Sequence, residues 1–127
     1  MRRTVLIMVV AMLACAPSAF AGGKANTRLT LDNIQSFPTG GISTTWSGDI
    51  FSSERDCKNK RRVIVYRVLE GADEKRGSTL SYKGSAQPGY YWLYNEEGIP
   101  PAGDYYAAVK PTANCKADSS PVYPFTT

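Results

Sequence analysis

Histidine is absent from the 127 residues, and the chain contains three cysteines. Without an imidazole the commonest general base is missing, and the usual His and Cys zinc sites cannot be assembled. Long apolar runs are also scarce: the run at residues 5–14 is too short for a membrane span, which needs ~20 residues. No internal repeat or amphipathic helix of useful length follows it. The sequence therefore predicts no cofactor and no transmembrane segment in the mature chain.

The N-terminus has the pattern of a secretory signal peptide. Arg2 and Arg3 precede the apolar run, and Ala19-Phe20-Ala21 supplies the small residues of a cleavage site. We expect residues 1–21 to be removed and residues 22–127 to form one secreted or cell-surface domain. A lipoprotein with Cys15 as the lipidated residue is the rival interpretation, although Met12-Leu13-Ala14 matches the usual lipidation pattern poorly.

Charge gives little support for a nucleic-acid partner. Removal of Arg2 and Arg3 lowers the formal net charge from +4 to +2, which is ordinary for a mixed protein surface. The same processing removes Cys15 and leaves Cys57 and Cys115 as an even pair in an oxidising compartment. These two cysteines are therefore expected to form a disulfide.

Glycine and proline recur at short intervals between runs rich in Val, Ile, Thr, Tyr and Trp, which is typical of an all-β sandwich. Alternation places Leu29 and Leu31 inward in the first strand, and Gly48 suggests a kink or bulge in the second. We expect a polar turn at residues 70–77 and an edge position for the last strand, which contains two prolines. The expected strands, about seven in number, are residues 27–32, 42–52, 62–69, 78–83, 90–94, 104–110 and 119–125.

The run Ala102-Gly103-Asp104-Tyr105-Tyr106-Ala107 resembles the corner motif of immunoglobulin domains, with Ala107 in place of the cysteine. The order of Cys57, residues 61–67, 89–91 and 103–107, and Cys115 resembles small secreted bacterial modules akin to fibronectin type III and carboxypeptidase-regulatory-like domains. This resemblance implies an immunoglobulin-like or prealbumin-like sandwich with a tyrosine corner at Tyr105. It also implies that the two cysteine loops lie at the same end, and it carries over no catalytic residue.

The aromatic run at residues 90–94 is the strongest candidate for ligand binding. By period 2, Tyr91 and Leu93 share one face, and Tyr90, Trp92 and Tyr94 share the other. An exposed row of Tyr90, Trp92 and Tyr94 would form a platform for a sugar ring or a partner protein. The opposite orientation would bury Trp92 and remove the platform, and core packing is the favoured interpretation.

Charged residues offer weaker candidates. The adjacent acids Glu96–Glu97 and Asp73–Glu74 have the residue types of glycoside hydrolysis, but solvated turn residues are the favoured interpretation. A basic group with the composition of an anion site surrounds Cys57, and a solvated loop is favoured there too. Its members are Arg55, Lys58, Lys60, Arg61 and Arg62.

We therefore predict a non-enzymatic binding or structural module with an unknown extracellular protein or polysaccharide as partner. One alternative is a carbohydrate-binding module that uses the aromatic row. A further alternative is a secreted protease inhibitor that presents the loop at residues 95–103, where Pro100 and Pro101 would rigidify the tip.

Overall fold

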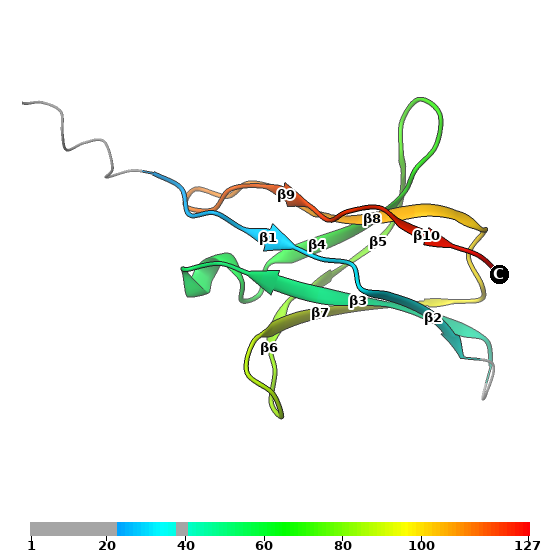
Figure 1. The fold of residues 1–127 in the computed structure, drawn as a ribbon, viewed down its shortest axis with the longest axis horizontal. Helices are drawn as coiled ribbons and strands as arrows, with labels where there is room; N and C mark the ends of the chain where they lie inside the picture. Colours follow the sequence, from blue (N-terminus) through cyan, green and yellow to red (C-terminus); the bar gives the residue numbers. More distant parts are fainter. Residues whose placement is uncertain (1–22, 38–40) are drawn as a thin grey trace, which may run out of the picture.

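The computed structural model describes residues 23–37 and 41–127, which form two antiparallel β-sheets facing each other (Figure 1). The expected signal peptide and Cys15 lie outside the described residues. The predicted all-β sandwich with one disulfide is confirmed. Its elements are β1 (Arg28–Leu29), β2 (Asn33–Phe37), β3 (Ser43–Phe51), the 3₁₀-helix η2 (Arg55–Cys57), β4 (Arg62–Arg67), β5 (Glu74–Leu80), β6 (Tyr82–Lys83), β7 (Tyr90–Glu97), β8 (Gly103–Val109), β9 (Asp118–Ser119) and β10 (Tyr123–Phe125).

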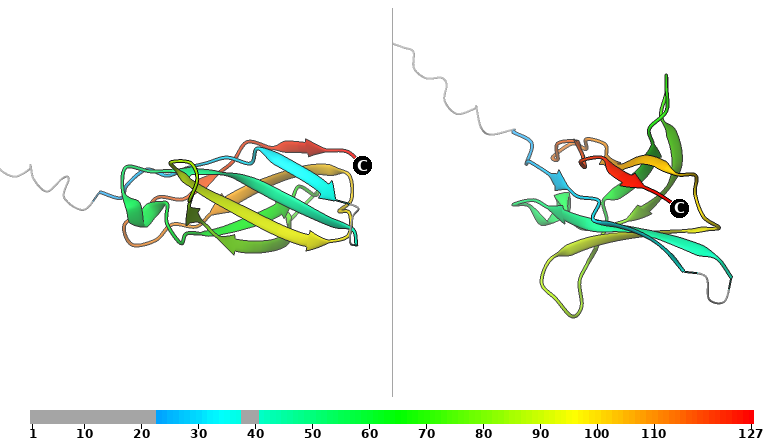
Figure 2. Two further views of the ribbon diagram at one scale, coloured as in Figure 1. Left: turned by 90° about the horizontal axis from the view of Figure 1, so that it is seen from below. Right: turned by 45° about the vertical axis from the view of Figure 1, so that its right-hand side comes forward.

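Each sheet has five strands. In the first sheet the order is β1-β3-β7-β6, with β2 also paired to β3. In the second sheet the order is β10-β8-β4-β5, with β9 also paired to β8. Seen from two further directions, the sheets form two layers whose strands run along the long axis of the molecule (Figure 2). The central strands are therefore β3 and β7 in one layer and β4 and β8 in the other.

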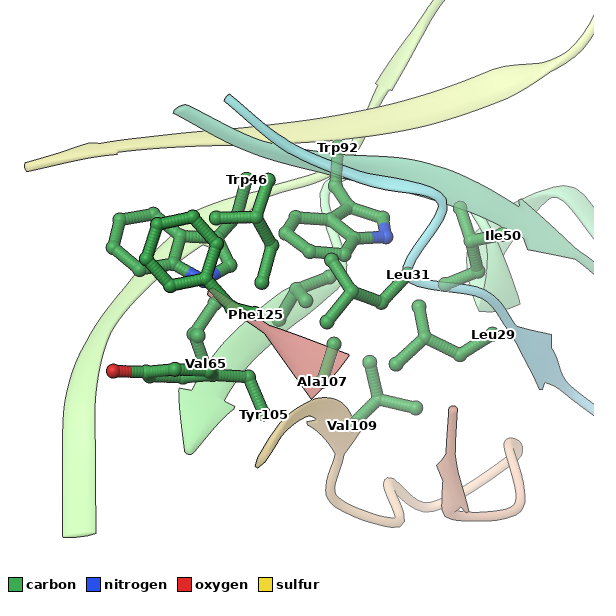
Figure 3. Close-up of a cluster of buried hydrophobic side chains, with 12 residues drawn as sticks. Leu29, Leu31, Trp46, Ile50, Val65, Trp92, Tyr105, Ala107, Val109 and Phe125 are labelled. Carbon is green, nitrogen blue, oxygen red and sulfur yellow. The ribbon is translucent and has the colours of Figure 1, made fainter. Parts of the chain in front are cut away.

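Side chains at every second position of the strands fill the space between the layers. Along β3, buried and half-buried residues alternate from Ser43 to Ile50. Trp46 and Trp92 from the first sheet meet Tyr105 from the second, and all three side chains are fully buried (Figure 3). The predicted inward positions of Leu29 and Leu31 are confirmed. Tyr105, Ala107 and Val109 on β8 are buried as well. Burial of such large side chains is the main stabilising term of this fold.

The predicted bulge at Gly48 is wrong, because β3 pairs with β7 without a register break at that position. The irregularity lies on the neighbouring strand instead. Leu29 pairs with Ile50 and Asn33 pairs with Ser47, so the β1–β2 segment has one residue more than β3 between these pairs. A Cβ at Gly48 would meet the Thr30 carbonyl oxygen at 2.0 Å. Glycine is needed there for this close approach of two backbones.

The expected bounds of two strands and one turn were inaccurate. The predicted strand at 62–69 ends at Arg67, and it is a central strand with β5 and β8 as its neighbours. The predicted turn at 70–77 already contains the start of β5. The predicted strand at 78–83 is interrupted at Ser81, where the chain passes from the second sheet to the first. The side chain of Ser81 fixes this crossing, because it accepts from the Arg61 backbone N–H and donates to the Lys58 carbonyl.

The C-terminal strand is also divided. Its two pieces, β9 and β10, both pair with β8 and leave Val122 exposed between them. The predicted edge position is confirmed. Pro124 is compatible with pairing there, because an edge strand needs hydrogen-bond donors on one side only.

The tyrosine corner predicted at Tyr105 is confirmed. Its hydroxyl donates to the Pro101 carbonyl four residues upstream, at 2.6 Å. This bond ties the β7–β8 connection to the start of β8.

Tyr105→Phe is expected to lower the free energy of unfolding by about 1 kcal/mol, the usual net value of one hydrogen bond with a partly buried acceptor. Urea unfolding monitored by circular dichroism measures it. Tyr123→Phe is the matched control, because no hydrogen bond of the Tyr123 hydroxyl occurs within the described residues and that ring also packs against the core. Equal losses in both variants would contradict a specific role for the corner bond.

Candidate functional site

The aromatic row Tyr90, Trp92 and Tyr94 faces inward, so it does not form the exposed platform that would have bound a sugar ring or a partner protein. Trp92 is fully buried, and its indole N–H donates to the Thr30 carbonyl at 2.9 Å. Tyr90 and Tyr94 are half-buried against the core cluster. The reason is the central position of β7, which directs its largest side chains toward the facing sheet. The outward face carries Tyr91 and Leu93 instead.

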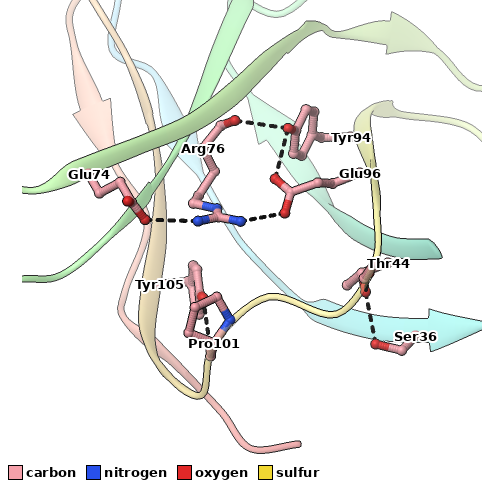
Figure 4. A network of polar contacts seen from close by, with 9 residues as sticks. Ser36, Thr44, Glu74, Arg76, Tyr94, Glu96, Pro101 and Tyr105 are labelled. Carbon is pink, nitrogen blue, oxygen red and sulfur yellow. Dashed lines mark hydrogen bonds and ion pairs between the residues drawn. The ribbon is translucent and has the colours of Figure 1, made fainter. Parts of the chain in front are cut away.

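Two of the candidate carboxylates bind the same arginine. Glu74 on β5 and Glu96 on β7 both form ion pairs with Arg76, at 2.8 and 2.5 Å (Figure 4). Because Arg76 lies on β5, only its pair with Glu96 joins the two sheets. The hydroxyl of Tyr94 lies 3.0 Å from the Arg76 carbonyl and 3.1 Å from a Glu96 carboxylate oxygen. Burial, followed by the nearby Glu96 charge, raises the pKa of Tyr94. The interpretation as solvated turn residues is therefore wrong for Glu96, whose position in this network is structural.

Asp73 has a different partner from Glu74. It lies in the β4–β5 turn and accepts a hydrogen bond from the Tyr106 hydroxyl at 2.5 Å. This bond lowers the pKa of the Asp73 carboxyl and raises that of Tyr106 to about 12. The Tyr106 ring also stacks on Tyr66 on the outer face of the second sheet. The structure therefore brings neither adjacent pair of acids together as an acid and base on a common cleft.

The loop before β8 is shorter than predicted. Strand β7 continues to Glu97, which leaves residues 98–102 rather than 95–103 as the connection. Pro100 is buried and the Pro101 carbonyl accepts from Tyr105, so this loop is held against the core.

The disulfide between Cys57 and Cys115 is present, with the two Cα atoms 5.4 Å apart. It joins the β3–β4 connection to the β8–β9 connection, as the resemblance implied. Ala25 also bonds through its backbone to Asn114 and Lys116. We call this region, residues 23–28, 52–62 and 110–118, the disulfide end. It brings together the beginning of the described chain and two loops that are distant in sequence.

Arg61 holds the disulfide end together from inside. Its side chain is only 4% exposed, and it donates four hydrogen bonds to three segments of this region. The acceptors are the carbonyls of Cys57 (2.7 Å), Lys110 (2.9 Å) and Lys116 (2.9 Å) and the hydroxyl of Thr27 (3.1 Å). Burial lowers the pKa of the guanidinium. Arginine nevertheless stays protonated at neutral pH, so the four acceptors face a buried cation.

The basic group around Cys57 is therefore not uniform. Arg61 is buried, whereas Arg55, Lys60 and Arg62 are exposed and Lys58 lies 5.0 Å from the centre of the Tyr90 ring. The sequence contained a signal for this difference. Arg61 has the same parity as Val63 and Val65, which face inward, and Arg62 has the parity of the outer face.

A hollow of about 300 Å³ opens on the outer surface of the disulfide end. Three exposed cationic residues line it in addition to the buried Arg61: Lys60 just before β4, Arg62 at its start and Lys110 just after β8. We call this the basic hollow and these three exposed residues the rim cations. Its lining is Lys60, Arg61, Arg62, Ile64, Lys110, Pro111 and Thr112.

Hydrogen bonds hold two parts of the rim in place. Lys60 has a φ of 54°, the one left-handed non-glycine backbone among the described residues. Its N–H donates to the Ser81 carbonyl at 3.0 Å, which fixes this uncommon conformation. The guanidinium of Arg62 donates to the Ser78 hydroxyl at 3.3 Å. The Lys60 backbone and the Arg62 side chain are therefore pre-formed parts of the hollow.

No carboxylate neutralises the rim cations. In residues 23–37 and 41–127 the ion pairs are those of Arg76 with Glu74 and Glu96, and none involves Lys60, Arg62 or Lys110. Like charges grouped around a hollow repel one another, and a bound anion relieves that repulsion. A second hollow, of about 310 Å³ at the opposite end, has no charged residue in its lining. The basic hollow is therefore the better candidate site.

Comparison of the chain with protein-family models, curated proteins and solved structures found no match. Among the described residues, no three His, Cys, Asp or Glu side chains are grouped to hold a metal ion. The described part of the chain also contains no helix with the length and apolarity of a membrane span.

Proposed function

We propose that this chain is an exported, non-enzymatic binding module that recognises an anionic ligand at the disulfide end. The observation that carries the proposal is the basic hollow, where three cations without carboxylate partners surround a partly pre-formed space. The sequence alone leaves the ligand open and favours a solvated loop here. The position of the basic segment around the hollow supports an anionic ligand.

The strand order supports an immunoglobulin-like classification. Constant-type immunoglobulin sandwiches place strands A, B, E and D in one sheet and C, F and G in the other. In this chain the A, B, E and D positions correspond to β1, β3, β7 and β6. The C, F and G positions correspond to β4, β8 and β10, and β5 extends this second sheet. Domains of this architecture commonly bind through the loops at one end, which is where the basic hollow lies.

Few side chains of the types used in catalysis are free to act, which supports a non-enzymatic role. The chain has no histidine, and Cys57 and Cys115 are joined in a disulfide. Glu74 and Glu96 bind Arg76. A hydrolytic activity that disappears when a single carboxylate is changed would contradict this part of the proposal.

Chromatography of residues 22–127 on phosphocellulose tests the binding site. We expect Lys60→Ala/Lys110→Ala to elute at clearly lower salt than the unchanged domain, because two of the three rim cations are lost. Lys75→Ala/Lys83→Ala is the matched control: it removes the same charge from exposed positions on β5 and β6 and should elute close to the unchanged domain. Equal shifts in both double variants would show simple ion exchange and would refute a site in the hollow.

A further inference from the structure

The fold separates charge along its long axis. Residues 23–28, 52–62 and 110–118, the disulfide end, contain nine Lys and Arg against three Asp and Glu, a net charge of +6. Residues 67–76 and 96–104 contain three basic and six acidic residues, a net charge of −3. These last segments lie where β4 ends and β8 begins, at the opposite end of the sandwich (Figure 1). The small overall charge therefore conceals a molecule with a strongly cationic end and an acidic end.

Such a charge distribution orients a protein at an anionic surface. The cationic end is attracted and the acidic end is repelled, and both effects act within about a Debye length of the surface. The basic hollow lies at the attracted end. An anionic surface that attracts this end would therefore come close to the rim cations first.

The lining of the hollow is not that of a purely ionic site. Ile64 forms part of it together with Pro111, so apolar surface lies beside the rim cations. Two strands also end with an exposed apolar side chain beside an arginine. Phe51 ends β3 and pairs with Arg28, and Leu80 ends β5 and pairs with Arg62. The Arg28 guanidinium lies 4.2 Å from the centre of the Phe51 ring. Cations next to exposed apolar side chains are typical of surfaces that meet lipid headgroups and the upper part of acyl chains.

We infer that the disulfide end docks on the phosphate headgroups of an anionic lipid bilayer, with a headgroup phosphate in the basic hollow. This inference rests on the proposed function and names the source of its anionic ligand. An acidic polysaccharide is less well matched, because a linear polyanion favours a row of cations along a groove. Here the three cations surround one hollow that has an apolar lining.

Vesicle sedimentation with residues 22–127 tests the inference. The probes are phosphatidylcholine vesicles with and without phosphatidylglycerol, at low and at high salt, and dextran sulfate as a soluble polyanion. We expect binding to the phosphatidylglycerol vesicles at low salt and none to pure phosphatidylcholine. Lys60→Ala/Lys110→Ala should bind about 30-fold more weakly, from roughly fivefold for each cation near a membrane surface. Lys75→Ala/Lys83→Ala should stay within about threefold of the unchanged domain, since its lost charges lie outside the disulfide end.

The outcomes separate the two proposals. Binding to dextran sulfate that depends on Lys60 and Lys110, without binding to anionic vesicles, would overturn the membrane inference and leave the proposed function intact. If the unchanged domain bound neither dextran sulfate nor anionic vesicles, both the proposed function and the membrane inference would be overturned. Equal weakening of vesicle binding in the two double variants would also overturn the inference. Thermal unfolding of both variants checks that each remains folded.

Discussion

Arg61→Met is expected to lower the free energy of unfolding by about 3–5 kcal/mol, because four acceptors lose a charged donor and each buried acceptor left unsatisfied costs roughly 1–3 kcal/mol. Methionine fills a similar volume but donates no hydrogen bond. The carbonyls of Cys57, Lys110 and Lys116 would therefore lose a charged donor in a buried region. The predicted loss is comparable to the whole stability of a marginal domain.

Arg62→Met is the control for this variant. The two residues are neighbours in the chain, but Arg62 is exposed on the outer face, so its replacement should change stability by no more than about 0.5 kcal/mol. Guanidinium unfolding followed by tryptophan fluorescence compares the two. Arg61→Lys should retain only part of the stability, because an ammonium cannot reproduce the planar fork of donors. Similar losses for Arg61→Met and Arg62→Met would contradict the role given to the buried guanidinium.

Removal of the disulfide is expected to cost about 4 kcal/mol in the chain-entropy model, because Cys57 and Cys115 close a loop with a sequence separation of 58. The Cys57→Ala/Cys115→Ala variant should therefore be far less stable than the oxidised domain. Denaturant unfolding in the presence and absence of a reductant measures the same quantity without mutation. Mass analysis after alkylation should show two labelled thiols in residues 22–127 only after reduction. Labelled thiols in the native exported protein would refute the bond.

The stability losses from Arg61→Met and from removal of the disulfide should not be additive. Arg61 bonds to the carbonyl of Cys57 and to the residue that follows Cys115, so both changes loosen the same loops. Residues that share partners usually show interaction energies of roughly 0.5–3 kcal/mol. The triple variant is therefore expected to lose less than the two separate losses combined.

Period-2 patterning identified which side chains share a face, and it did so correctly for Leu29 and Leu31 and for the aromatic run on β7. It could not say which face of β7 is inward, because both faces carry aromatic residues. That choice depends on the sheet that packs opposite, a long-range property that no local pattern contains. The disulfide, in contrast, needed only a count of cysteines and an export signal, and its prediction was confirmed.

The basic hollow lay beyond what local patterns reveal. Lys110 is distant in sequence from Lys60 and Arg62, and only the pairing of β4 with β8 brings them together. Arg61 was missed for a simpler reason. A charged residue was assigned to a solvated loop, although its parity with Val63 already placed it on the inner face. The division of the expected strands at Ser81 and near Thr30 also depended on contacts between segments that are distant in sequence.

The bridge between Ala25 and Cys115 also determines how the domain would respond to mechanical force. The described chain starts at the disulfide end, while β10 places the C-terminus at the opposite end (Figure 1). A force applied between the termini therefore acts along the strands and loads their hydrogen bonds in shear. The disulfide would exclude the enclosed loop from extension. At roughly 3.4 Å per residue, unfolding would lengthen the oxidised chain to roughly 160 Å, against roughly 360 Å after reduction.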